Sequence, residues 1–394
     1  MSKRNYNVFF NTHTVSGIVI SVALYVIFFA GAFALFKDEI AIWEEGKPIG
    51  HIQRHQIDYD KIIEHLDKEY ELSGRDLQIN FGGTEDKIYV FMGASKDSLA
   101  SEKGKTSQYF SLDINSNEKQ TYPQYYSLGE FMYRLHFFAQ LPSLGIYLAG
   151  FVSLFFLFAI VTGVIVHWKK IISNFYVFDP KVVLRRVWTD AHTALGFLGL
   201  PFQFIFAVTG AYFCLSVLVL IPANMLYNGD QEKLIEDVLP ERKTYAWETT
   251  SNERIPSFNE FANQTVTKWE NFYLTRSFIS NYGGTNMRYT LSGELKDSER
   301  FIGTGRIVYA AYKGTIASVK DPNISDYNEN VSRVLGRLHY ADFGGIFMKI
   351  TYFILAWITC FVIITGVLIW IESRNKKAMT LSERLYTAKV GHIY

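Results

Sequence analysis

Four long apolar stretches limit what this chain can fold into. They cover residues 15–36, 143–166, 194–223 and 344–371, and few charged side chains interrupt them. About 20 apolar residues in a helix cross the hydrocarbon core of a bilayer, so each stretch is long enough. The first stretch is too long for a signal-peptide core, and the charged sequence KDE follows it without a small-residue cleavage site. The sequence therefore predicts a membrane protein with four retained spans.

Positive charge gathers in the short segments beside the spans, which predicts the orientation of the chain. These basic residues are Lys3, Arg4, Lys169, Lys170, Lys181, Arg185, Arg186, Arg374, Lys376 and Lys377. Short basic loops stay on the cytoplasmic side of a membrane. We therefore expect both termini and the loop at 169–188 to be cytoplasmic, and the two long connections to lie outside. The net charge of +1 gives no reason to expect a nucleic-acid partner.

The chain also contains an internal repeat with constant spacing. The sequence RLH occurs at 134–136 and again at 337–339, and Gly163 in VTGVIVHW matches Gly366 in ITGVLIWI at the same offset of 203. In the first and third spans NTHTVSG matches DAHTALG at an offset of 179, which Gly31 and Gly210 share. Between the spans, FGGTEDKIYVFMG resembles YGGTNMRYTLSG. One unit of span, outer domain and span is therefore duplicated, and an axis along the membrane normal should relate the two parallel copies.

The repeat leads to a plan of the domains. We expect a membrane protein whose all-α four-helix transmembrane bundle arises from a duplicated helix–outer domain–helix unit, with two small α+β outer domains. Each outer segment begins with a helical pattern, at 59–72 and 257–269, and continues with alternating stretches typical of strands. The expected segments are the first span with its N-terminus (1–36), the first outer domain (37–142), the second span (143–168), the cytoplasmic loop (169–188), the third span (189–223), the second outer domain (224–343), the fourth span (344–371) and the tail (372–394).

Histidines recur in pairs at both ends of the predicted spans. His13 and His192 begin the first and third spans on the cytoplasmic side, and His136 and His339 open the second and fourth spans on the outer side. His167 ends the second span inside and has no histidine counterpart in the other repeat. An ionisable residue at membrane depth is costly and indicates function. One interfacial histidine could simply reach for water, but two symmetry-related pairs are harder to explain in that way.

Paired histidines of this kind predict haem iron. Neutral imidazole is a good iron ligand, and two imidazoles from facing helices can bind one haem from both sides. We expect His136 and His339 to face each other near the outer surface. His13, His192 and His167 should lie at a similar depth near the inner surface, and which two of these three bind an inner haem stays open.

Residues near the histidines suit the same cofactor. Gly17 and Gly196 lie one helical turn after the inner histidines of their spans, which leaves a bare helix face for a flat macrocycle. Arg134 and Arg337 lie two residues before the outer histidines and suit haem propionates.

Other classes of protein fit the pattern less well. A zinc site would need acidic or cysteine ligands beside the histidines. A transporter would have carboxylates and broken helices at the midplane. A sensor or anchor whose outer domains bind protein or peptide is a third class. His51 and His55 have a spacing that suits a metal, but their polar surroundings are typical of a solvated loop, and whether they bind anything stays open.

The span motifs resemble a known family. The sequences HTVSG…FFAGAFALFKDE, RLHF…VTGVIVHWKK, DAHTALGFLGLPF and RLHYADFGG…ITGVLIW are similar to those of the PepSY-associated transmembrane proteins. The resemblance covers all four spans and, more loosely, the outer domains. That family includes bacterial inner-membrane siderophore reductases that carry b-type haems. One departure is visible, because the family pattern often reads LPFH where this chain reads LPFQ, ending at Gln203.

The resemblance implies a function and a set of ligands. Its motif histidines map onto His13, His136, His167, His192 and His339, as axial ligands of two haem b groups. Electrons would pass from a separate cytoplasmic or quinol donor to a ferric siderophore or other Fe(III) chelate in the periplasm, and Fe(II) would be released for uptake. The chain would thus be an oxidoreductase of the bacterial inner membrane. The alternatives are a PepSY-type sensor, anchor or peptidase regulator without redox activity, and a quinone-linked electron-transfer subunit.

Overall fold

The chain divides into two compact units. The computed structural model describes residues 1–46, 57–81, 87–168, 184–231, 233–234, 243–295, 301–324 and 327–374. The helical unit comprises Met1–Lys37, Leu128–Gly229 and Leu335–Tyr394, and the sheet unit comprises Asp38–Ser127 and Asp230–Val334. Each unit therefore draws on both sequence repeats.

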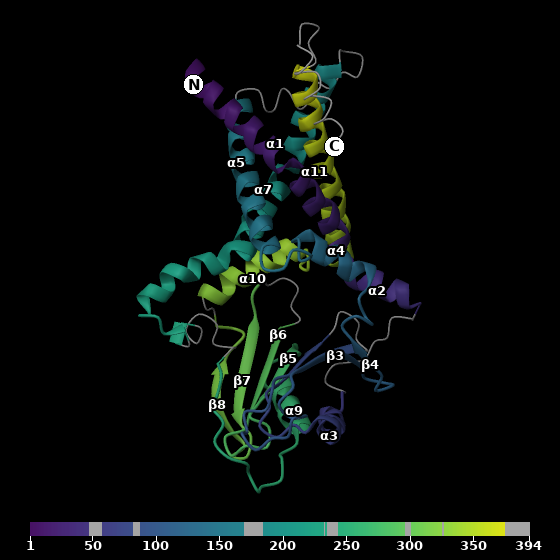
Figure 1. The fold of residues 1–394 in the computed structure, drawn as a ribbon, viewed down its shortest axis with the longest axis vertical. Helices are drawn as coiled ribbons and strands as arrows, with labels where there is room; N and C mark the ends of the chain where they lie inside the picture. The colour runs from purple at the N-terminus through teal and green to yellow at the C-terminus, as the bar shows by residue number, and fades with distance from the viewer. Residues whose placement is uncertain are drawn as a thin grey trace. The chain divides into compact units, whose positions relative to one another are not determined.

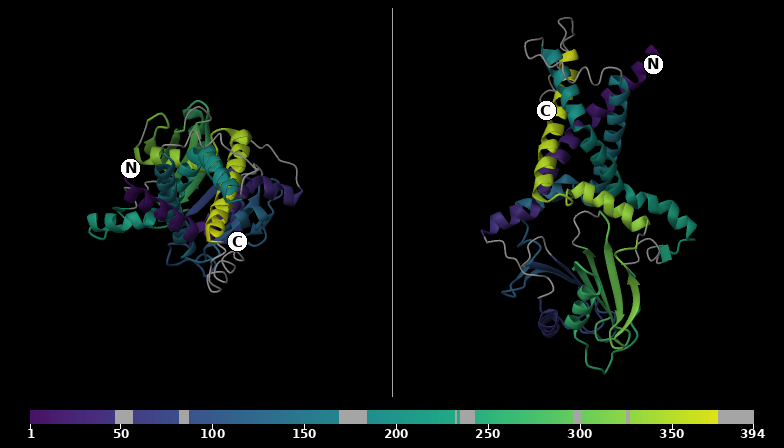
Figure 2. Two further views of the ribbon diagram at one scale, coloured as in Figure 1. Left: turned by 90° about the horizontal axis from the view of Figure 1, so that it is seen from above. Right: turned by 180° about the vertical axis from the view of Figure 1, so that it is seen from behind.

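Four long helices form the helical unit (Figure 1). They are α1 (Lys3–Ala34), α5 (Gly145–His167), α7 (Leu184–Leu226) and α11 (Gly345–Arg374). All four are long and apolar enough to cross a membrane, over Lys3–Ala34, Gly145–His167, Arg185–Ser216 and Gly345–Arg374. Helices α1 and α7 each pack against both α5 and α11, so the four helices close into a ring, which Figure 2 shows from further directions. The four predicted spans are confirmed as membrane-length helices.

Two short helices precede the second and fourth spans. They are α4 (Leu128–His136) and α10 (Tyr327–Tyr340). We expected His136 and His339 to open the spans themselves, but they lie at the carboxyl ends of these separate helices. Phe138 and Ala341 follow at equivalent repeat positions, both with φ of 55°, and their left-handed backbone breaks the helix before each span begins. The chain turns at these positions, and each histidine ring contacts a neighbouring helix, α1 for His136 and α7 for His339.

The sheet unit contains the remaining helices and every named strand. Its helices are α2 (Lys37–Glu45, apart from its first residue), α3 (Tyr59–Tyr70) and α9 (Phe258–Lys268). Its strands are β1 (Leu77–Phe81), β2 (Lys87–Met92), β3 (Gln108–Asp113), β4 (Lys119–Thr121), β5 (Phe272–Ser280), β6 (Arg288–Leu295), β7 (Thr304–Ala310) and β8 (Thr315–Lys320). Helices α3 and α9 match the two predicted helices, and β2, β3, β6 and β7 match the alternating stretches.

One correction concerns the number of outer domains. The strands form a single antiparallel eight-stranded sheet in the order β4-β3-β2-β1-β5-β6-β7-β8. Strands β1 and β5, one from each repeat, pair at its centre with Leu77 opposite Ile279. The expectation of two separate α+β domains, at 37–142 and 224–343, was therefore wrong. Each repeat contributes four strands, and pairing β1 with β5 satisfies two edges that would otherwise expose unpaired backbone groups.

Helices α3 and α9 cap each other across the repeat. The backbone N–H of Tyr59 donates to Asn259 Oδ1 at 2.8 Å, and the N–H of Phe258 donates to Asp60 Oδ1 at 2.6 Å. The first N–H groups of a helix have no partner within it, so these side chains satisfy donors that would otherwise need water. Because each helix supplies the acceptor for the other, the two halves of the sheet unit are joined at this point.

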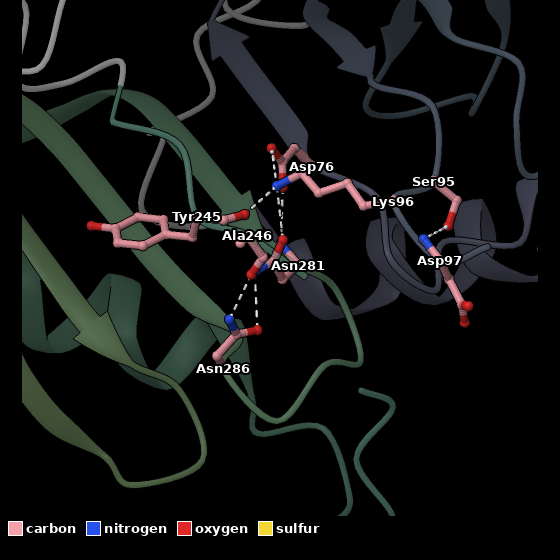
Figure 3. A network of polar contacts seen from close by, with 8 residues as sticks. All are labelled: Asp76, Ser95, Lys96, Asp97, Tyr245, Ala246, Asn281 and Asn286. Carbon is pink, nitrogen blue, oxygen red and sulfur yellow. Dashed lines mark hydrogen bonds and ion pairs between the residues drawn. The ribbon is translucent and has the colours of Figure 1, made fainter. Parts of the chain in front are cut away.

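A polar network joins the same two halves beside the β1–β5 pair (Figure 3). Lys96 Nζ donates to Asp76 Oδ1 at 2.9 Å, to the Tyr245 carbonyl at 2.8 Å and to Asn281 Oδ1 at 2.8 Å. The Asn281 amide donates to the Ala246 carbonyl at 2.9 Å. An ammonium group has three donors, so these contacts use all of them. The network supports the central strand pair with residues from both repeats.

Candidate functional site

The structure brings the histidines of the helical unit together in two pairs. The ring centroids of His13, on α1, and His192, on α7, lie 6.1 Å apart. Those of His136, on α4, and His339, on α10, lie 5.9 Å apart. Both expected pairs therefore form within the structure, each between equivalent positions of the two repeats.

Each inner histidine is held by the second span of its own repeat. His13 Nδ1 lies 2.8 Å from the Ala159 carbonyl oxygen on α5. His192 Nδ1 lies 2.9 Å from the Val362 carbonyl oxygen on α11. A carbonyl oxygen can only accept, so Nδ1 carries the proton and donates in both rings. This tautomer leaves Nε2 with a lone pair.

Each outer histidine is held by the first span of its own repeat. His136 Nδ1 donates to the Ile27 carbonyl oxygen on α1 at 2.7 Å. His339 Nδ1 lies 2.8 Å from the hydroxyl oxygen of Thr209 on α7. That hydroxyl donates its only proton to the Ile205 carbonyl at 2.7 Å, so it accepts from the His339 ring. All four paired histidines thus share the same tautomer.

Glycines make room for three of the four rings. A Cβ atom at Gly31 would lie 2.6 Å from His136 Nδ1, and one at Gly163 would lie 3.0 Å from His13 Cε1. A Cβ atom at Gly366 would lie 3.2 Å from His192 Cε1. Only a residue without a side chain lets the ring approach the helix backbone closely enough to bond to its carbonyl.

The two pairs fit the ligation of one iron each. Metal-bound histidines usually donate their second N–H to a carbonyl or carboxylate, which fixes the ring and raises its basicity. An imidazole nitrogen binds a metal at about 2 Å and the ring centroid lies about 1 Å farther, so two rings on opposite sides of one iron have centroids about 6 Å apart. Both observed separations agree with that value. The donor set is neutral imidazole only, which suits haem iron.

An aromatic layer lies in the core of the helical unit and reaches the outer pair. Its rings belong to Phe28, Phe156, Phe202, Phe206 and Tyr352, with centroid separations that include 4.4 Å for Phe202 and Phe206 and 5.5 Å for Phe28 and Phe156, and Phe206 also contacts His339 at 4.8 Å. On α1, Ile27 follows His13 by fourteen residues, which is about 21 Å at a rise of 1.5 Å per residue. The inner and outer pairs are therefore two separate sites.

His167 lies near the inner pair. It is the last residue of α5, close enough to His13 and His192 to interact with them electrostatically. Of these three histidines, His13 and His192 have ring centroids 6.1 Å apart. The geometry favours His13 and His192 as the inner ligands.

The arginines expected near the cofactor are engaged with carboxylates of the chain. Arg337 Nε lies 3.1 Å from Asp342 Oδ1, and Arg134 Nη1 lies 4.0 Å from Glu130 Oε1. Either arginine would have to share or exchange its carboxylate to contact a haem propionate. Their role as propionate ligands stays a prediction.

Other sequence candidates lie elsewhere or outside the described residues. His51, His55, Lys169, Lys170 and Lys181 fall in segments that the structure does not describe. Gln203, at the position where the family pattern often has histidine, is buried on α7 and donates to Thr359 Oγ1 at 3.4 Å. It contributes a core hydrogen bond rather than a metal ligand.

An apolar cavity on the helical unit is distinct from the histidine pairs. It has a volume of about 420 Å³, and its lining includes Ile160 and Val164 of α5, Trp168 just after α5, and Leu200, Pro201 and Phe204 of α7. No polar side chain lines it, so it has nothing to orient a cofactor. The histidine pairs remain the candidate site.

Comparison with known families shows to which family the chain belongs. A family model described as PepSY-associated TM region matches residues 10–373. The chain belongs to this family. The match includes all four membrane-length helices and both histidine pairs, and it confirms the family resemblance of the span motifs. A comparison with individual curated proteins gave no match.

Sequence reasoning missed several residues of this PepSY-associated protein that hold the histidines. The repeated TG dipeptides at 162–163 and 365–366 served only as landmarks of the repeat. In the structure, Thr162 and Thr365 donate to the carbonyls of Ala159 and Val362, which also accept from the inner histidines. The available signal was that both residues of the TG dipeptide recur at the offset of 203. A helix–helix contact alone would need only the glycine.

Proposed function

We propose that this protein is a bacterial inner-membrane haem reductase that carries electrons across the bilayer to a periplasmic Fe(III) chelate, such as a ferric siderophore. The observation that carries the proposal is the state of the four paired histidines. Each presents Nε2 as a free base while its Nδ1 proton is engaged, and each pair has the separation of two ligands on one iron. Structural histidines would have no need of this shared arrangement.

Under this proposal the residues divide into an inner and an outer set. His13 and His192 hold one haem b, and His136 and His339 hold another. A b-type haem supplies reversible one-electron transfer at its iron. The helix carbonyls and Thr209 keep the rings oriented and their Nδ1 protons in place. The aromatic layer excludes water from the apolar core beside the outer site.

The direction of transfer follows from charge and from the chemistry of iron. The basic residues beside the inner histidines, which include Arg185 and Arg186, support a cytoplasmic position for that end by the positive-inside rule. They also offer a docking surface for an acidic electron carrier, and a membrane quinol is the other candidate donor. Reduction outside would release the metal, because Fe(II) binds hard oxygen chelators more weakly than Fe(III) does.

An anaerobic reoxidation experiment tests the function. Purified protein is reduced, freed of excess reductant and mixed with a ferric siderophore while its visible spectrum is followed. We expect the spectrum to return to that of the oxidised protein, with one Fe(II) trapped for each electron lost. The gallium(III) complex of the same siderophore has the same shape and is not reduced, so it should leave the protein reduced. If many ferric chelates fail to reoxidise a haem-loaded protein, a quinone-linked role becomes the better account.

A further inference from the structure

One of the four paired histidines has a different kind of hydrogen-bond acceptor. His13, His192 and His136 donate Nδ1–H to helix carbonyls, whereas His339 donates to the hydroxyl of Thr209. His192 Nδ1 also lies 3.3 Å from the Thr365 hydroxyl, but its closer partner is the Val362 carbonyl at 2.9 Å. Comparison of the two repeats shows that the acceptor of His339 differs from that of His136, its equivalent in the first repeat. At the offset of 179, the counterpart of Ile27, whose carbonyl binds His136, is Phe206. His339 therefore bonds to a side chain one turn farther along α7 than the repeat would place its acceptor.

The repeat also shows what created the new acceptor. The counterpart of Thr209 in the first span is Ala30, which has no polar group. Thr209 is 1% exposed, and its hydroxyl proton is committed to the Ile205 carbonyl at 2.7 Å. Its lone pairs are thus left for the His339 ring, 2.8 Å away.

Aromatic rings enclose His339 and keep it on this partner. Its ring centroid lies 4.8 Å from that of Phe206, 5.3 Å from that of Phe213 and 5.4 Å from that of Tyr340. A ring held on these sides cannot turn freely to another acceptor. Loss of the Thr209 hydroxyl would leave a buried N–H without its partner, which is costly in such surroundings.

We propose that Thr209 is a positioning residue for His339 and makes the two ligands of the outer site chemically unequal. This inference rests on the proposed haem function. A hydroxyl is a weaker acceptor than a helix carbonyl, so the His339 imidazole is less electron-rich than the other three. Outer hydrogen bonds of this kind tune the potential of a bound metal. The outer haem therefore has a higher reduction potential than it would with two carbonyl acceptors, which favours transfer from the inner site to the outer one.

The test compares three variants of the full-length protein. Thr209→Val keeps the shape of the side chain and removes the acceptor, and Thr209→Ser keeps the hydroxyl. Thr359→Val is the matched control, because Thr359 is also buried in the bundle, donates to the Leu355 carbonyl and accepts from Gln203 rather than from a histidine of the two pairs. Potentiometric titration followed by visible spectroscopy gives the potential of each haem, and electron paramagnetic resonance reports the ligand field of each ferric site.

We expect Thr209→Val to shift the potential and the resonance of the outer haem alone, and to release that haem about 10-fold faster. Thr209→Ser should retain the wild-type values, and Thr359→Val should change neither site. The proposal is overturned if Thr209→Val leaves the outer site unchanged, or if Thr209→Ser or Thr359→Val disturbs it equally. A wild-type protein without haem would instead refute the proposed function, so the two failures can be told apart.

Discussion

At the scale of single residues, each inner histidine depends on a glycine and a threonine one helix away. Gly163 lets the His13 ring approach α5, and Thr162 bonds the carbonyl that accepts the ring proton. Gly366 does the same for His192 on α11. These contacts fix the tautomer before any cofactor binds, so the ligand geometry belongs to the protein and does not have to be created by the metal.

The glycine that seats an outer ring gives a sharp prediction. In Gly31→Ala, the new Cβ would lie 2.6 Å from His136 Nδ1, so the ring must move and lose the Ile27 carbonyl. We expect this variant to lose the outer haem and keep the inner one, as measured by haem content and spectrum. Val19→Ala is the control on the same helix, since the Val19 side chain is 77% exposed. Equal haem content in both variants would contradict the proposed role of Gly31 in making room for the His136 ring.

The sequence pattern located the histidines but not the glycines that contact their rings, and the role of Gly17 and Gly196 stays a prediction. It placed the cofactor face at Gly17 and Gly196, because helical periodicity shows which residues of one helix share a face. The closest ring contacts come instead from Gly31, Gly163 and Gly366, which lie on other helices than the rings they accommodate. Those contacts depend on how helices pack, which the spacing within one helix cannot reveal.

At the scale of elements, the two repeats depend on each other through α3 and α9. Asp60, in the first turn of α3, accepts the backbone N–H of Phe258 at the start of α9. In Asp60→Ala this buried N–H loses a charged acceptor, which costs about 1.5–3 kcal/mol. We expect faster hydrogen exchange in the first turn of α9 in the full-length protein. Glu64→Ala, on the exposed face of α3, should leave α9 unchanged, and equal effects would refute the reciprocal capping.

The same junction should weaken in acid. The Asn259 amide, followed by the Lys61 backbone N–H, lowers the pKa of Asp58, the N-cap of α3. Because the folded pKa lies below the unfolded value of about 3.9, the stabilisation is present above about pH 4 and is lost as the pH falls through the folded pKa. Asp58→Asn keeps a good N-cap that does not titrate. Thermal melts in detergent between pH 3 and 6 should therefore depend less on pH in this variant, and identical pH profiles would contradict the assignment.

The strands show where local patterns stop being informative. Alternation of apolar and polar residues located β2, β3, β6 and β7, as a strand predicts. Their observed burial is less regular, since β3 buries Phe110, Ser111 and Leu112 in succession. It did not show that β1 and β5 pair, since that register joins residues about 200 positions apart and leaves no mark in either strand alone. The duplication suggested two domains. The two copies share one sheet because β1 and β5 would each be an edge strand with unpaired backbone groups, and they pair with each other.

At the scale of the whole molecule, the duplicated order of elements predicts a single topology. In a variant lacking Cys214 and Cys360, we place one cysteine at Arg186 or at Lys313, which are both exposed. A maleimide that cannot cross membranes should label Lys313→Cys in intact spheroplasts and label Arg186→Cys only after permeabilisation. Labelling of both from outside would refute four spans with cytoplasmic termini, and the orientation of the two sites with them.

The haem content and visible spectrum of the purified protein test the central claim most directly. We predict two haem b groups per chain, with the sharp reduced bands of iron that has two histidine ligands. His136→Ala or His339→Ala should remove about half of the haem and leave the inner site spectrally intact. His65→Ala, which changes a histidine on α3 beside Glu69, should remove none. A wild-type protein that binds no haem, or that keeps both haems when His136 or His339 is replaced, would contradict the account.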